Sequence, residues 1–227
     1  MEAAPVDPKL PTLMYFQGAG RADATRAACF LSGLKYNDVR LSQEEFGAKK
    51  ASGELPLGSV PVWIEDGVKY VQSNTILRMV CQRGGMYSTD PAEAWAIDSY
   101  LEAVEDNAGK FQPMLFTVLF GPGASGVTEE VLESAKGFFG KLSELIEKRM
   151  NAHGGKYLVG NRVTAADLKL ATGFYGTLYN EHFPCTPEQR EAMKSAVHQY
   201  PKAKQFFEET VPEFLGAYLA QRPAGPF

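Results

Sequence analysis

The stretch from Ser59 to Ser73 constrains the fold of this chain more than any other. It contains a proline, a β-rich run, Asp66-Gly67, a second β-rich run and then Gln72-Ser73. Apolar residues at helical spacing follow. An Asp-Gly pair between two such runs is typical of a two-residue β-hairpin. The proline stands at the head of the first strand, where no ladder donor is needed. The stretch therefore predicts a hairpin followed directly by a helix.

The start of that helix is a candidate binding position. Ser73 is expected to cap it, because a serine just before an apolar helical pattern accepts from free backbone N–H groups. Those N–H groups and the helix dipole favour a carboxylate. The hairpin and the helix end together suggest recognition of a small peptide.

Composition excludes several classes of protein. The chain has 227 residues, is 44% hydrophobic and 22% charged, and carries a net charge of −4. These values argue against disorder, and so mild an acidic balance argues against nucleic acid as a partner. The three cysteines and three histidines show no ligand spacing, so we expect neither a metal site nor a disulfide framework.

The same kind of reading argues against a membrane protein. The longest apolar run, Met114 to Phe120, is too short to span a bilayer. The first eleven residues contain acidic residues and prolines and no apolar core, so they do not read as a secretory signal. The expectation is a cytoplasmic, reducing environment.

The remaining elements divide the chain into two halves. In the first half, strands and helices alternate in the order βαβαββα, with a helix from about Arg21 to Gly33 whose apolar side includes Cys29-Phe30-Leu31. After Asp90-Pro91 strand signals vanish. Pro113 is expected to bend or end the first helix of the second half. The expected further helices are 128–151, 164–179, 187–200 and 202–219. The fold class is therefore α/β followed by all-α.

Three motifs resemble the soluble glutathione S-transferases, in the order that family has them. They are Tyr15-Phe16 followed by Gly20-Arg21-Ala22-Asp23, Val60-Pro61 with Gln72-Ser73, and the run from Gly160 to Asp167. The resemblance implies a thioredoxin-like domain over 10–86 and a helical bundle domain over 90–220. It also implies glutathione as co-substrate, no metal, and a homodimer. The early tyrosine and the Gly-Arg-Ala turn look most like the sigma class.

The resemblance assigns the chemistry to Tyr15, whose hydroxyl would stabilise the thiolate of glutathione. Arg21 would assist by polarising the sulfur, although pairing with Asp23 is an equal alternative. Without the resemblance, Tyr15 would read as a half-buried strand aromatic.

The remaining site residues also come from the resemblance. Val60, in a cis peptide with Pro61, would offer its backbone to the cysteinyl part, and Gln72 and Ser73 would hold the γ-glutamyl carboxylate. Asp106 would reach the partner's site, with Glu102 and Glu105 as alternatives. The residues placed toward the glycyl end are Phe46 and Lys49 or Lys50, of which we favour Lys50. A phenylalanine cannot donate an indole N–H, and Ser59 is short, so we expect weaker or rearranged glycyl contacts.

The second-substrate pocket is the least determined part. Phe16, Phe111 and Met114 are the candidates, together with the Phe227 tail, although such side chains at helical spacing are more often core. Thr164 and Asp167 form a capping box with a structural role. Two alternatives to conjugation stay open: a glutathione-dependent prostaglandin D-type isomerase, and a non-catalytic carrier or structural protein of the same fold.

Overall fold

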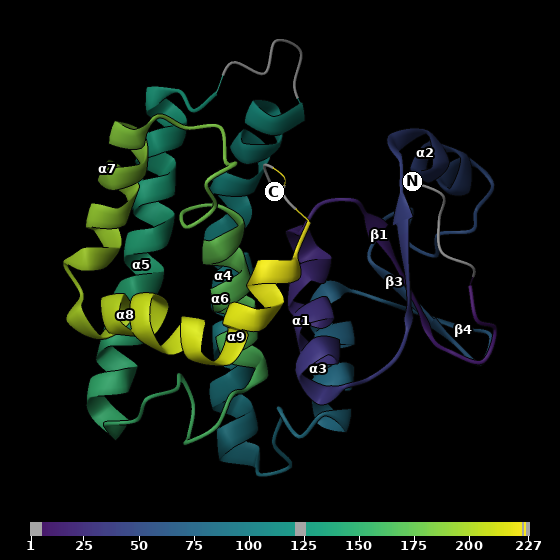
Figure 1. Ribbon diagram of the computed structural model, residues 1–227, viewed down its shortest axis with the longest axis horizontal. Helices are drawn as coiled ribbons and strands as arrows, with labels where there is room; N and C mark the ends of the chain where they lie inside the picture. Colours follow the sequence, from purple (N-terminus) through teal and green to yellow (C-terminus); the bar gives the residue numbers. More distant parts are fainter. Residues whose placement is uncertain (1–5, 121–125, 224, 226–227) are drawn as a thin grey trace. The chain divides into compact units, whose positions relative to one another are not determined.

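The computed structural model describes residues 6–120, 126–223 and 225. The chain divides into two compact units between Tyr87 and Ser88 (Figure 1). The first unit contains a four-stranded sheet, and the regular elements of the second unit are helices over its described residues.

The sheet of the first unit has the strand order β2-β1-β3-β4. The strands are β1 (Thr12–Phe16), β2 (Asn37–Leu41), β3 (Val62–Glu65) and β4 (Val68–Val71). Strand β1 pairs parallel with β2 and antiparallel with β3, and β3 and β4 form the expected hairpin. Asp66 and Gly67 turn the hairpin with φ of 49° and 77°, the left-handed conformation that an Asp-Gly loop favours.

Helices cover both faces of this sheet. They are η1 (Gly20–Ala22), α1 (Asp23–Ser32), α2 (Gln43–Ala51) and α3 (Ser73–Arg83). Helices α1 and α3 pack against each other on one face, and α2 lies on the other (Figure 1). Met14, Leu41 and Val62 form the core beneath α2, while Leu13 and Trp63 are fully buried. The expected βαβαββα order is confirmed.

Two details of the first unit correct the sequence predictions. Phe30 is 41% exposed, so it does not lie on the apolar side of α1, which is formed by smaller side chains and Cys29. Ser73 is the first residue of α3 rather than its cap. The N-cap position belongs to Gln72, whose carbonyl accepts from the N–H of Ile76 at 3.0 Å.

The second unit consists of helices along its described length. These are α4 (Pro91–Phe120), α5 (Glu129–His153), α6 (Ala165–Gly176), α7 (Pro187–His198), α8 (Pro201–Gln205), the π-helical turn η2 (Phe206–Thr210) and α9 (Val211–Gln221). Helix α5 packs against α4 and α7, and α6 packs against α4. Among the described helices, none is long and apolar enough to cross a membrane.

Of the two outcomes expected at Pro113, a bend or an end, the end is wrong, because helix α4 continues to Phe120. A proline inside a helix removes one backbone hydrogen bond. Phe111 and Leu115, on either side of it, are 4% and 3% exposed, so continued burial of the apolar face offsets that loss. The hydroxyl of Thr117 also donates to the carbonyl of Pro113 at 3.1 Å.

The capping box at the start of α6 is confirmed. Asp167 is fully buried and accepts from the backbone N–H of Thr164 at 2.8 Å and from its hydroxyl at 2.7 Å. Its other oxygen accepts from the N–H of Leu158 at 2.8 Å. The carboxylate therefore joins the preceding loop to the first turn of α6.

Candidate functional site

The strand register brings the predicted site residues of the first unit to one end of the sheet. Met14 lies opposite Val62, and Val62 lies opposite Val71. The residues that follow Met14, precede Val62 and follow Val71 must therefore meet at the same end. They are Tyr15 and Phe16, Val60 and Pro61, and Gln72 and Ser73.

Tyr15 is the central side chain of this end. It is 5% exposed, and its hydroxyl oxygen accepts a hydrogen bond from the backbone N–H of Arg21 at 3.0 Å. Burial raises the pKa of the phenol above 10.0, although the N–H of Arg21 and the charges of Arg21 and Arg26 act in the opposite direction. The phenol is thus neutral at physiological pH and can donate its proton to an anion.

Gly20 makes room for this hydroxyl. Its φ is +44°, a conformation that side chains rarely adopt. A Cβ atom placed there would lie 2.4 Å from the Tyr15 oxygen. Only glycine lets the chain turn this close to the phenol.

Arg21 contributes through its backbone as well as its charge. The sequence assigned it a role by its guanidinium alone, and the N–H contact to Tyr15 is an addition from the structure. Sequence reasoning missed Arg26, a 3% exposed arginine in α1 whose guanidinium carbon lies 5.7 Å from the centre of the Tyr15 ring. Its contacts left no signal in the sequence, because Arg26 shares α1 with another charged residue, Asp23.

The neighbouring turn and helix start have unusual backbones. The Val60–Pro61 peptide is cis, as the resemblance implied. Gln72 has a φ of 72°, which is uncommon for a residue other than glycine. Ser73 follows it in a buried position at the first turn of α3, where backbone N–H groups lack helical partners. This end can receive a carboxylate.

Aromatic contacts connect Tyr15 to α2. The ring centres of Tyr15 and Phe16 are 5.3 Å apart, and those of Phe16 and Phe46 are 5.0 Å apart. The Lys50 ammonium lies 6.0 Å from the centre of the Phe46 ring. The structure thus brings together all of these candidates, including Phe16, which was assigned to the second substrate.

The other candidates belong to the second unit. Asp106 is exposed on α4, and Met114 is half-buried on the same helix. Phe111 packs against Phe138 and Phe139, with ring centres 5.0 and 5.8 Å away. This packing is typical of a core residue. The roles of these side chains toward a ligand stay predictions, as does any role of Phe227, which lies outside the described residues.

Two of the three cysteine thiols, Cys29 and Cys81, are unsuited to nucleophilic chemistry. Burial raises the pKa of Cys29 to about 12, and it raises the pKa of Cys81 as well. Both remain protonated at neutral pH. Over the described residues, no cluster of acidic, histidine or cysteine side chains could hold a metal ion.

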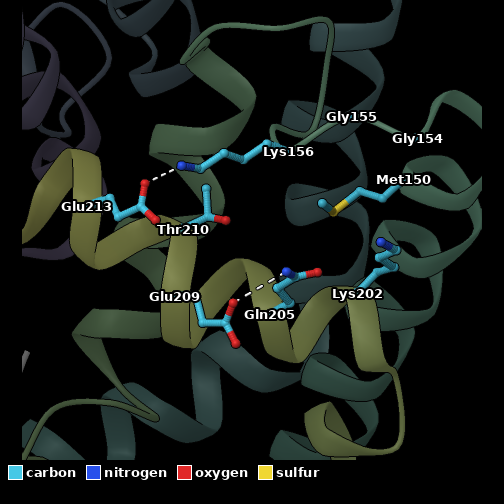
Figure 2. A pocket seen from close by; sticks show the side chains of 9 residues that line it. All are labelled: Met150, Gly154, Gly155, Lys156, Lys202, Gln205, Glu209, Thr210 and Glu213. Atoms are coloured by element: carbon cyan, nitrogen blue, oxygen red, sulfur yellow. Dashed lines mark hydrogen bonds and ion pairs between the residues drawn. The ribbon is translucent and has the colours of Figure 1, made fainter.

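A separate cavity of about 340 Å³ lies in the second unit (Figure 2). It opens between the end of α5 and the segment from α8 to α9. Its charges balance: Lys156 contacts Glu213, and Gln205 donates to Glu209 at 3.3 Å (Figure 2). The lining contains none of the predicted site residues.

The comparisons with known proteins all find similarity to glutathione S-transferases. Residues 124–210 match the family model for the glutathione S-transferase C-terminal domain. Glutathione S-transferase 3 of Caenorhabditis elegans is 29% identical over 163 residues, which cover 70% of this chain and 76% of the relative. Glutathione S-transferase A of Cavia porcellus is 28% identical over 208 residues, covering 87% and 89%. The crystal structure of the glutathione S-transferase from Ascaris lumbricoides superposes with a TM-score of 0.79 at 27% identity, covering 96% of this chain and all of that one.

Proposed function

We propose that the chain is a glutathione S-transferase that binds reduced glutathione and conjugates it to small, apolar electrophiles; the family match over residues 124–210 and the relatives at 28–29% identity support this. The N-terminal unit supplies the glutathione site, and Tyr15 acts on the sulfur. Glutathione is the co-substrate, and the reaction uses the ligand's thiol rather than a thiol of the protein.

The observation that carries this proposal is the hydrogen bond from the N–H of Arg21 to the Tyr15 oxygen. Because the oxygen accepts from this N–H, the phenol is held in one orientation while its own proton stays available. The raised pKa of Tyr15 keeps that proton in place. A carrier or structural protein has no need of such an arrangement.

The size of the effect is reasonable for one hydroxyl. A free cysteine-type thiol has a pKa of about 8.5, so only a few per cent is thiolate at neutral pH. Lowering that pKa by about two units requires about 2.7 kcal/mol. A hydrogen bond to a charged group contributes about 1.5–3 kcal/mol, which accounts for most of the shift.

In the reaction, the thiol proton leaves to solvent as the thiolate forms. The sulfur lone pair then makes a bond to the electrophilic carbon, and the leaving group departs with its bonding pair. The turn at Val60-Pro61, Gln72 and the helix start at Ser73 would orient the tripeptide, which raises the rate by fixing the geometry of attack. Phe46 and Lys50 would border its glycyl end, and Asp106 would pair with the ammonium in the partner's site.

The test compares wild type with Tyr15→Phe in conjugation of glutathione to a chlorodinitrobenzene. We expect both proteins to bind glutathione-resin, with kcat falling about 10- to 100-fold in the variant because one hydrogen bond to the anion is lost. Tyr70→Phe, on β4 of the same unit, is the matched control and should retain full rate. Equal rates for wild type and Tyr15→Phe would refute the role of Tyr15.

We further propose a sigma-type arrangement, supported by the early tyrosine and the Gly20-Arg21-Ala22 turn. Phe16, Phe111 and Met114 are the candidates for contact with the electrophile. Assay of prostaglandin-endoperoxide isomerisation beside conjugation separates the two activities that a bound thiolate allows.

We also propose that the protein acts as a homodimer in the cytoplasm, as the resemblance implies. Arg78 on α3 is the residue we expect to reach an acid of the partner. Light scattering after size exclusion should give twice the 24.9 kDa mass of the chain. A single-chain mass at micromolar concentration would contradict the dimer.

A further inference from the structure

The segment that joins β1 to η1 fixes the position of the N–H that contacts Tyr15. This segment is Gln17-Gly18-Ala19, followed by Gly20. Two of these four residues are glycines, so the segment has few side chains to fix its own conformation. Something outside the segment must hold it.

Two arginine side chains do so through the segment's carbonyl groups. Arg26 donates to the carbonyls of Phe16 at 3.2 Å, Gly18 at 2.8 Å and Ala19 at 3.5 Å. Arg40 donates to the carbonyl of Gln17 at 2.7 Å. Four successive carbonyls therefore accept hydrogen bonds from two guanidinium groups.

Asp38 connects these arginines. Its Oδ1 atom accepts from Arg26 Nε at 3.1 Å, and its Oδ2 atom accepts from Arg40 at 2.9 Å from Nε and lies 2.8 Å from Nη2. Asp38 and Arg40 are two residues apart on β2, opposite Leu13 and Tyr15 of β1. They therefore point to the same face of the sheet as Tyr15.

Burial makes this arrangement specific to arginine at position 26. The side chain is 3% exposed, and a buried cation is tolerated only when it is paired and its donors are used. The planar guanidinium meets a carboxylate and three carbonyls at once. A lysine keeps the charge but has one nitrogen, which cannot reach all of these acceptors.

We infer that Arg26 and Arg40, joined through Asp38, are positioning residues for the reaction. They hold the segment after β1 so that the N–H of Arg21 reaches the Tyr15 hydroxyl. A phenol oxygen that accepts a hydrogen bond is a stronger donor through its own proton. Loosening the segment would thus weaken the hydrogen bond from Tyr15 to the sulfur. This inference rests on the proposed function.

The test uses Arg26→Lys and Arg40→Lys, with Arg83→Lys as the matched control. Arg83 also makes a two-pronged contact with a carboxylate of the same unit, at 2.8 Å to both oxygens of Glu65, but it contacts no part of the segment after β1. For each protein, the ultraviolet absorbance of bound glutathione thiolate is measured against pH, together with the KM for glutathione and the midpoint of thermal unfolding.

We expect Arg26→Lys to raise the pKa of the bound thiol by about one unit, which is about tenfold less thiolate below that pKa. Arg40→Lys should raise it by about half as much, since one carbonyl contact is lost rather than three. Arg83→Lys should lower the unfolding midpoint and leave the thiol pKa unchanged.

An unchanged thiol pKa in Arg40→Lys and in folded Arg26→Lys would overturn the inference and leave the arginines with a role in stability alone. If Arg26→Lys does not fold, Arg40→Lys decides the question. Absence of thiolate in the wild-type complex is a different result, because it refutes the proposed function together with the inference that rests on it.

Discussion

Gly20 has both a backbone conformation and a close contact with Tyr15 that favour glycine, and mutation can separate the two effects. Gly20→Ala would introduce both backbone strain, at φ +44°, and a Cβ atom 2.4 Å from the Tyr15 oxygen. Because that contact displaces the phenol, we expect kcat for conjugation to fall at least about tenfold, with a loss of about 1–2 kcal/mol in stability. Steady-state kinetics and urea unfolding measure the two effects.

Gly33→Ala is the control for strain without displacement. Gly33 has a φ of +68° at the end of α1, and a Cβ atom there would meet nothing within 4 Å. Its stability should fall by about 1 kcal/mol, while activity stays at the wild-type level. Loss of activity in both variants would mean that Tyr15 responds to general destabilisation rather than to contact with residue 20.

The sequence predicts site residues best where a residue type has one strong local meaning. The hairpin at Asp66-Gly67 was predicted from turn chemistry, and the cis peptide at Pro61 was predicted from the family resemblance. The contacts of Gly20 and Arg26 were out of reach, because they join segments whose spacing in the chain says nothing about which atoms meet. The N–H of Arg21 was missed for the same reason: a backbone donor leaves no mark in the sequence.

At the scale of elements, the start of α6 depends on one buried carboxylate. Asp167→Ala would leave the N–H groups of Leu158 and Thr164 without their acceptor in the interior. Each such group costs about 1–3 kcal/mol, so we expect a loss of about 3 kcal/mol or more in the free energy of unfolding. Urea titration followed by far-ultraviolet circular dichroism measures it, since the second unit is helical.

An exposed box of the same kind provides the comparison. At the start of α2, Ser42 and Glu45 exchange the same hydrogen bonds at 3.1 and 2.7 Å, but both side chains are exposed to water. Glu45→Ala should therefore lower the free energy of unfolding much less than Asp167→Ala. Similar losses for the two variants would show that burial does not set the value of the Asp167 cap.

Element boundaries were harder to predict than element types. The order of strands and helices in the first unit was expected, but α2 begins at Gln43 rather than near Phe46, and α3 starts one residue early because Gln72 adopts a positive φ. In α4, the helix continues past Pro113, and Phe111 and Leu115 are buried on either side of it. Local chemistry describes a helix end well only when tertiary packing does not act on the same residues.

For the whole molecule, Asp167 also sets a pH dependence of stability. Burial raises its pKa to about 6, above the value of about 3.9 in an unfolded chain. The folded state therefore binds this proton more tightly, and the stabilisation is fully present below about pH 4 and lost as the pH rises through 6. We expect the stability of wild type relative to Asp167→Asn to fall by up to about 3 kcal/mol between pH 4 and 7.5.

Chemical unfolding at several pH values tests this, with Asp167→Asn removing the titrating group and leaving the other carboxylates in place. Glu65 and Glu93 act in the opposite direction, because hydrogen bonds from Arg83, Ser88 and Arg162 lower the pKa of their carboxyls. Taking the difference between the two proteins cancels their effect. A difference that does not change with pH would contradict the assignment to Asp167.

The burial of the cysteines has a consequence for an enzyme that works among alkylating agents. An enzyme whose substrates are electrophiles risks having its own cysteines alkylated by them. Cys29 and Cys81 are 1% and 0% exposed and stay protonated, so we expect these two thiols to resist alkylation. Intact-mass analysis after brief maleimide treatment should show at most one adduct on the native protein, at half-buried Cys185, and three after denaturation.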